Sequence, residues 1–253
     1  MERNAAGEEV RPLDISITKN VLGLFINSAV LLVIMMSCVR WYKKHPLEDG
    51  APKGGVGMIE ATVLSIYNDV IKGCIGENYR RYAPYLLTAF FFILVNNLMG
   101  LIPIFPGGAN VTGNIAITLV LALCTFIMTN VYGTKAYWKE IFWPDVPTWL
   151  KVPIPMMPLI EFFGIFTKPF ALMIRLFANI MAGHAAVLSL IAIIFITVKS
   201  GPVINGSMTV VSVAFDIFMN ALEILVAFIQ AYVFTMLSAV FIGLSQVKEH
   251  AEK

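Results

Sequence analysis

An arginine stands inside an otherwise apolar stretch of the second half of the chain. Arg175 opens the segment RLFANIMAGH, residues 175–184, which follows PFALMI and precedes AAVLSLIAIIFITV. A guanidinium group that cannot lose its proton costs roughly 2.5 to 3.5 kcal/mol at the centre of a membrane helix. Such a cost requires a structural partner or a function, so Arg175 is the first candidate functional residue.

A histidine and a glutamate add a second kind of chemistry. His184 closes the same segment, and Glu223 lies in the next apolar run. An imidazole titrates at about pH 6.5, and a carboxyl group taken out of water titrates closer to that range, so the two can exchange protons near neutral pH. The guanidinium titrates at about 12.5 or above and can only attract, repel or block. The three residues together predict a proton path with a charge barrier.

The last apolar run carries a polar residue at every seventh position. These residues are Thr209, Asp216, Glu223 and Gln230, with Asn220 beside them. Seven residues make almost two helical turns, so the side chains form one stripe with a group about every 10.5 Å. Ionisable groups in membrane helices face the bundle or a water-filled cavity and mark ion paths. For Asn220, Thr209 and Asn179 the alternative of helix-to-helix hydrogen bonding stays open.

Composition sets the class of protein that positions these residues. The 253 residues are 58% hydrophobic and 13% charged, whereas soluble domains carry about 25% charged residues. The chain is therefore predicted to be an integral membrane protein. A net charge of +2 excludes a basic nucleic-acid surface. The three cysteines form no CxxC or His-spaced group, so the sequence indicates neither a zinc site nor a disulfide framework. No metal and no cofactor are expected.

Five apolar runs supply the membrane helices. About twenty apolar residues cross a bilayer, which predicts spans at 20–39, 84–103 and 113–133. Two longer runs, 157–198 and 207–246, form a hairpin within residues 134–253, which end in a cytoplasmic tail. A forty-residue helix measures about 60 Å, twice the hydrocarbon thickness, so these helices must tilt, bend or project. The predicted fold is all-α, with about five transmembrane helices.

Residues 54–81 are predicted to form an amphipathic helix. One apolar stripe contains Ile59, Val63, Ile66, Val70 and Cys74, while the charged residues lie elsewhere. This period is typical of a helix that lies at the membrane interface or packs on the bundle.

The distribution of lysine and arginine predicts the orientation. With residues 1–19 outside, the inside segments hold twelve basic residues and the outside segments four. We therefore expect the carboxyl terminus in the cytoplasm and the turn at 199–207 outside. The first run is interpreted as a retained span rather than a cleaved signal, because its apolar core is long and polar residues precede it.

The hairpin provides a ruler for depth. Residues equally far from its turn, near position 203, lie at equal depth, so His184 is level with Glu223, and Arg175 with Gln230. The step of about 100° per residue puts Arg175 and Asn179 on one face and His184 on the opposite side. A continuous pore past this point would leak protons. The barrier therefore implies a moving partner whose carboxylate carries each proton past Arg175.

Two long motifs resemble subunit a of F-type ATP synthases. They are TKPFALMIRLFANIMAGH at 167–184 and NALEILVAFIQAYVFTMLSAVFIGLS at 220–245, with weaker support from NNLMGLIPIFP at 96–106. The resemblance implies that Arg175 faces the carboxylate of the rotating c-ring, with Gln230 close by. It also implies an acid and a histidine at the positions of Glu223 and His184. Asn179 matches the asparagine of the arginine motif, and Asn97 matches a polar residue near the external side.

The resemblance further implies a proton-translocating stator subunit of the membrane Fo sector, with two offset aqueous half-channels. Its expected partners are the c-ring, the peripheral-stalk b subunits, other ATP synthase subunits and the lipid bilayer, in a bacterial inner membrane. The chain itself has no phosphate loop and is not expected to be catalytic. An autonomous proton channel or another proton-coupled transporter remains the alternative.

Overall fold

The computed structural model describes residues 2–3, 9–10, 18–45, 52, 54–102, 111–142 and 156–246. Predictions that fall on other residues, including most of 1–19 and the tail after 246, lie outside the described residues. Two short antiparallel strands, β1 (Glu2–Arg3) and β2 (Glu9–Val10), precede the helices.

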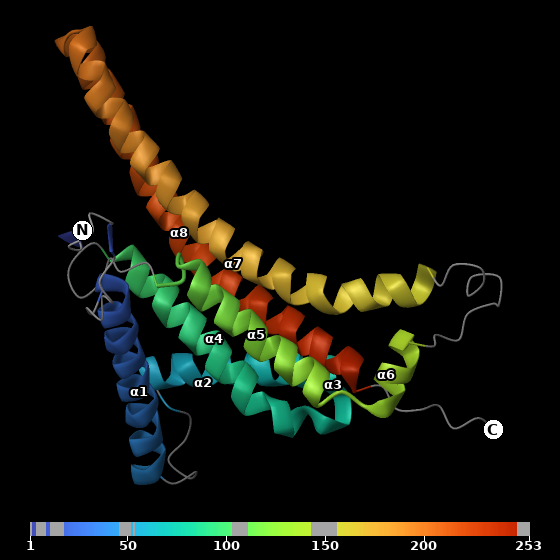
Figure 1. Cartoon of the computed structure of the whole chain (residues 1–253). Coiled ribbons are helices and arrows are strands. Elements are labelled where there is room, and N and C mark those ends of the chain that lie inside the picture. The colour runs from blue at the N-terminus through green and yellow to red at the C-terminus, as the bar shows by residue number, and fades with distance from the viewer. Residues whose placement is uncertain are drawn as a thin grey trace.

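Helices make up nearly all of the described chain (Figure 1). In order they are α1 (Lys19–Lys44), α2 (Gly55–Ser65), the π-helical η2 (Ile66–Lys72), α3 (Gly73–Ile75), the 3₁₀ turn η3 (Gly76–Asn78), α4 (Tyr79–Leu101), α5 (Ile115–Val131), α6 (Lys135–Phe142), α7 (Met156–Thr197), η5 (Val198–Ser200) and α8 (Pro202–Ser245). In the described residues, four helical segments are long and apolar enough to cross a membrane, or five if the bent pair of α5 and α6 is one span. The all-α membrane fold is confirmed.

Helix α8 is the centre of the bundle, with α3, α4, α5 and α7 against it. Its core-facing positions are mostly small, which lets neighbouring backbones approach closely. Ala231 and Ala239 are fully buried, and Phe234 packs in one cluster with Phe90 and Leu86 of α4. Helix α1 joins through a buried hydrogen bond from Asn27 Nδ2 to Asn96 Oδ1 at 3.0 Å.

At Gly243 the backbone of α8 lies directly against the backbone of α3. A Cβ built there would overlap the backbone carbonyl of Cys74. We expect Gly243→Ala to lower the free energy of unfolding by about 1 to 3 kcal/mol, because backbone atoms cannot move aside as a side chain can. Denaturant unfolding of the complex in detergent measures the change. Gly206→Ala is the control in the same helix, where a Cβ meets nothing within 4 Å; equal midpoints for the two variants would contradict the close approach.

Residues 54–81 pack on the bundle but do not form one regular helix. Ile66 and Val70 are buried as the stripe predicted, yet the next buried positions are Ile71 and Ile75. The π-helical turn of η2 inserts one residue into the helical repeat and so moves the buried face forward by one position. Cys74 is partly buried against the same core cluster, as are Ile59 and Val63 of the predicted stripe. Gly76, with φ of 75°, ends the segment before α4.

The junction between α5 and α6 bends by 97°. Its backbone is held by the end of α8: the amide of Thr134 donates to the carbonyl of Ser245 at 2.9 Å, and Gln246 Nε2 donates to the carbonyl of Tyr132 at 2.7 Å. The first of these bonds satisfies a carbonyl that a helix end leaves without a partner. Helix α6 therefore turns across the end of the bundle instead of extending α5.

The two longest helices, α7 of 42 residues and α8 of 44, form the predicted hairpin. Figure 1 shows them side by side along a common curve that extends well beyond the other helices. The turn is shorter than predicted, because Gly201 at φ of 106° reverses the chain and α8 begins at Pro202. Thr197 donates across the turn to Asn205 Oδ1 at 3.0 Å. Pro169 lies inside α7 and removes one backbone hydrogen bond.

Candidate proton-path site

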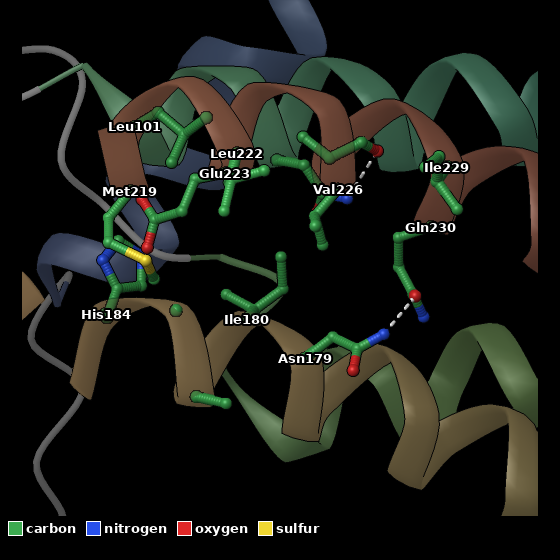
Figure 2. Close-up of a pocket in the computed structure, with 14 residues that line it drawn as sticks. Leu101, Asn179, Ile180, His184, Met219, Leu222, Glu223, Val226, Ile229 and Gln230 are labelled. Atoms are coloured by element: carbon green, nitrogen blue, oxygen red, sulfur yellow. Dashed lines mark hydrogen bonds between the residues drawn. The ribbon is translucent and has the colours of Figure 1, made fainter. Parts of the chain in front are cut away.

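A cavity of about 390 Å³ lies between α7 and α8 and is bordered by the end of α4 (Figure 2). Fourteen residues line it, most of them apolar. The five that the sequence singled out are Asn97, Asn179, His184, Glu223 and Gln230. The fold thus gathers residues from three separate stretches of the chain around one space.

Glu223 and His184 approach each other from opposite helices. In Figure 2 the carboxyl group of Glu223 on α8 points toward the imidazole of His184 on α7. Glu223 Oε1 is buried and has no hydrogen-bond partner within the described residues. An unsatisfied buried acceptor costs about 1 to 3 kcal/mol, so this oxygen is expected to be protonated or to bind water. The two residues lie opposite each other on the hairpin, where Gly183, the neighbour of His184, contacts Glu223.

Gly183 provides the space for this carboxyl group. A Cβ at Gly183 would lie 2.5 Å from Glu223 Oε1 and 3.2 Å from its Cδ. Because the obstructing atoms belong to a flexible side chain, an added methyl group would turn Glu223 away rather than separate the helices. A larger residue at 183 is thus predicted to change proton chemistry more than stability.

Gly183→Ala is therefore expected to slow proton transport. Forcing Glu223 off its rotamer costs about 0.5 to 1.5 kcal/mol, which corresponds to about a threefold to tenfold slower step. Proton pumping by the assembled complex in vesicles measures it, alongside the unfolding midpoint. Gly164→Ala is the control on the same helix, where the nearest side-chain atom, Lys168 Cε, is 4.0 Å away. Equal pumping by the two variants would show that Glu223 does not need this space.

Asn179 and Gln230 form the second pair across the cavity. Asn179 Nδ2 donates to Gln230 Oε1 at 2.6 Å, and Gln230 is buried. The sequence grouped Asn179 with Arg175, on the side of α7 away from His184. The structure instead places Asn179 and His184 around the same cavity. The cavity extends along α7 from Asn179 to His184, which is more than one helical turn, so side chains on different faces of the helix reach it. Arg175 borders no part of the cavity and is exposed on α7.

Asn97 is buried at the edge of the cavity, and both of its polar atoms have partners. Its Nδ2 donates to the carbonyl of Ala227 at 3.3 Å, and its Oδ1 accepts from Thr112 Oγ1 at 2.7 Å. Asn97 therefore ties α4 to α8 in addition to bordering the site. Thr112 was not predicted, and nothing in its sequence context marks it.

Asp216 and Asn220 lie outside the cavity. Asp216 Oδ1 is buried without a hydrogen-bond partner in the described residues. Asn220 is exposed, and its Nδ2 donates to the backbone carbonyl of Asp216 at 2.8 Å. Asn220 thus bonds within its own helix, while Asp216 leaves a second carboxyl oxygen unsatisfied two turns from Glu223.

A buried network of hydroxyl groups was also missed. Tyr85 of α4 lies 2.8 Å from Thr125 Oγ1 of α5, which lies 3.2 Å from Ser238 Oγ of α8. The recurrence of Thr118, Thr125 and Thr129 in an apolar run was the available signal. Each is buried and back-bonds to its own helix, so the network joins helices and does not open to the cavity.

Fold and site together define an all-α membrane protein that holds ionisable groups in a cavity between two very long helices. The family described as ATP synthase A chain matches residues 22–243, and this chain belongs to that family. It is 47% identical to ATP synthase subunit a of Chlorobium phaeobacteroides (strain DSM 266 / SMG 266 / 2430), over 94% of this chain and 68% of the relative.

Other bacterial relatives agree. The chain is 45% identical to ATP synthase subunit a of Chloroherpeton thalassium (strain ATCC 35110 / GB-78), over 95% of this chain and 70% of the relative. It is 39% identical to that of Myxococcus xanthus (strain DK1622), over 94% and 75%. The resemblance seen in the sequence is confirmed. The chain is a bacterial membrane protein, of a family that is a component of ATP synthase rather than its catalytic subunit.

Proposed function

We propose that this chain is the proton-translocating stator subunit of the Fo sector, with two offset aqueous half-channels that meet a rotating c-ring. The observation that carries the proposal is the carboxyl group of Glu223, which faces His184 in the cavity between α7 and α8 and whose Oε1 has no hydrogen-bond partner within the described residues. A helix-to-helix bond would have satisfied that oxygen, whereas a proton path needs it accessible to water or to a proton.

Arg175 is the charge barrier in this proposal. Its side chain is exposed on α7, and within the described residues no carboxylate forms an ion pair with it. A permanent charge at this depth requires a counter-charge, which a carboxylate of the c-ring would supply. Attraction to Arg175 deprotonates that carboxylate, and rotation then carries it onward to be reprotonated.

His184 and Glu223 pass protons between the external side and the ring, and Gln230 and Asn179 line the inner end of this path. Asp216 extends it toward the hairpin turn, with Asn220 beside it and Asn97 at the α4 border. The amino terminus is outside and the carboxyl terminus cytoplasmic, in the bacterial inner membrane. The b subunits of the peripheral stalk and other ATP synthase subunits hold the chain against the c-ring. A titratable pair favours H⁺ as the coupling ion.

Passive proton conductance tests the proposal. Vesicles containing the purified chain alone are expected to show little selective proton flux, and addition of the c-ring is expected to raise it. The reason is that the barrier leaves no continuous path without a moving carboxylate. Robust selective flux through the chain alone would instead establish the alternative, an autonomous proton channel or another proton-coupled transporter.

A further inference from the structure

A second cavity, remote from the proton site, lies between α5 and α7. It is a groove of about 320 Å³ lined entirely by apolar side chains, a volume within the roughly 300 to 1,000 Å³ of ligand sites. Ala122 and Met173 are buried and form its floor. Leu123 and Phe170 are 45% and 60% exposed and form part of its rim. The groove therefore opens outward from the bundle and suits a long hydrocarbon chain.

A small polar pocket of about 10 Å³ adjoins the groove. Phe126 and Pro169 border both spaces. The pocket is also lined by Lys168, by Asn130 and by Tyr137 of α6, whose hydroxyl donates to Asn130 Oδ1 at 3.4 Å. Neither lining includes an aspartate or a glutamate in the described residues. The apolar groove thus ends at a positive charge with hydrogen-bonding groups beside it.

Lys168 has no carboxylate partner within the described residues. Its Nζ lies 6.0 Å from the centre of the Phe241 ring. Lys168 lies in the first third of α7, beside Tyr137 of α6. A lysine at the edge of the hydrocarbon layer extends its amino group toward the membrane interface and favours a negative counter-charge there. The composition of helix α6, bent by 97° from α5, suits that interface: its eight residues include Lys135, Lys139 and Glu140 beside Trp138, as is typical of headgroup depth.

We propose that the groove between α5 and α7 binds an anionic phospholipid, with one acyl chain along Leu119, Leu123 and Phe170 and the phosphate at Lys168. The lipid belongs to the leaflet on the side of α6. Charge complementarity favours a lipid over a transmembrane helix of another subunit, because an apolar helix would leave Lys168 without a counter-charge.

Photolabelling of the assembled complex tests this site. A phosphatidylglycerol analogue with a diazirine in one acyl chain is expected to label peptides containing residues 119–126 and 166–173. Lys168→Gln should lower this labelling about fivefold, the usual contribution of one basic residue to anionic-lipid binding. Leu123→Phe, which fills the groove and keeps the charge, should lower it as well. Lys199→Gln removes an exposed cation in η5, beyond the far end of α7, and should leave the labelling unchanged.

The preference for an anionic headgroup and the identity of the molecule in the groove are tested separately. The phosphatidylcholine form of the same probe should label the groove several-fold less. Equal labelling by the two headgroups, or labelling that Lys168→Gln does not change, would overturn the proposal. A photoreactive residue at Leu123 should give a lipid adduct in native membranes. A covalent adduct to another subunit there would show that a protein helix occupies the groove.

Discussion

Replacing Arg175 with alanine is expected to abolish ATP-driven proton pumping by the assembled complex. A unit charge pair about 4 Å apart contributes about 4 kcal/mol at an effective dielectric constant of 20, which corresponds to about a thousandfold in rate. Because the side chain is exposed and bonds to nothing else in the described residues, its removal should leave the unfolding midpoint unchanged. Fluorescence quenching of a pH probe in inverted vesicles measures pumping.

Two further variants separate a barrier from a structural role. Lys199→Gln removes an exposed cation from the hairpin turn and should pump normally. Arg175→Lys keeps a positive charge that can lose its proton in an apolar setting, so pumping should fall while ATP-independent proton leakage rises. Normal coupled pumping by Arg175→Ala would rule out the barrier.

Exchanging His184 and Glu223 is expected to preserve much of the proton flux that replacing both with alanine removes. The two side chains face each other across one cavity, so His184→Glu with Glu223→His keeps an imidazole and a carboxyl group in the same space. Loss of both proton carriers should slow transport by about a hundredfold, the usual contribution of a positioned acid or base. The exchanged protein should remain within about tenfold of the natural one.

Pumping rates measured as a function of pH distinguish the relay from simple packing. The exchanged protein should retain a pH-dependent rate, and the double alanine variant should lose that dependence. Ser207→Ala is the control, since Ser207 is exposed and bonds only to the backbone of its own helix turn. Equal loss in the exchanged and double alanine variants would argue against a relay pair.

The sequence predicted the hairpin, and it predicted that His184 and Glu223 lie opposite each other on its two helices. Helix length and apolar pattern are local properties. The turn near position 203 then determines which residues of the two helices lie opposite each other. The contact from Gly183 to Glu223 follows from that arithmetic, whereas the hydrogen bond from Asn179 to Gln230 does not, because the ruler put Gln230 level with Arg175. Arg175, His184 and Glu223 were visible because an ionisable group in an apolar run costs so much that few sequences carry one without cause.

Tertiary contacts determined three features that the local sequence pattern could not predict: the buried face after Val70, the bend before α6 and the set of residues around the cavity. The shift of the buried face from Val70 to Ile71 depends on a π-helical turn that packs on α4 and α8, and the 97° bend before α6 depends on the carbonyl of Ser245 over a hundred residues away. Helical periodicity gives the direction of a side chain around one straight axis. Because α7 and α8 curve along each other, Asn179 and His184 both border one cavity and Arg175 lies outside it. This arrangement depends on the paths of both helices.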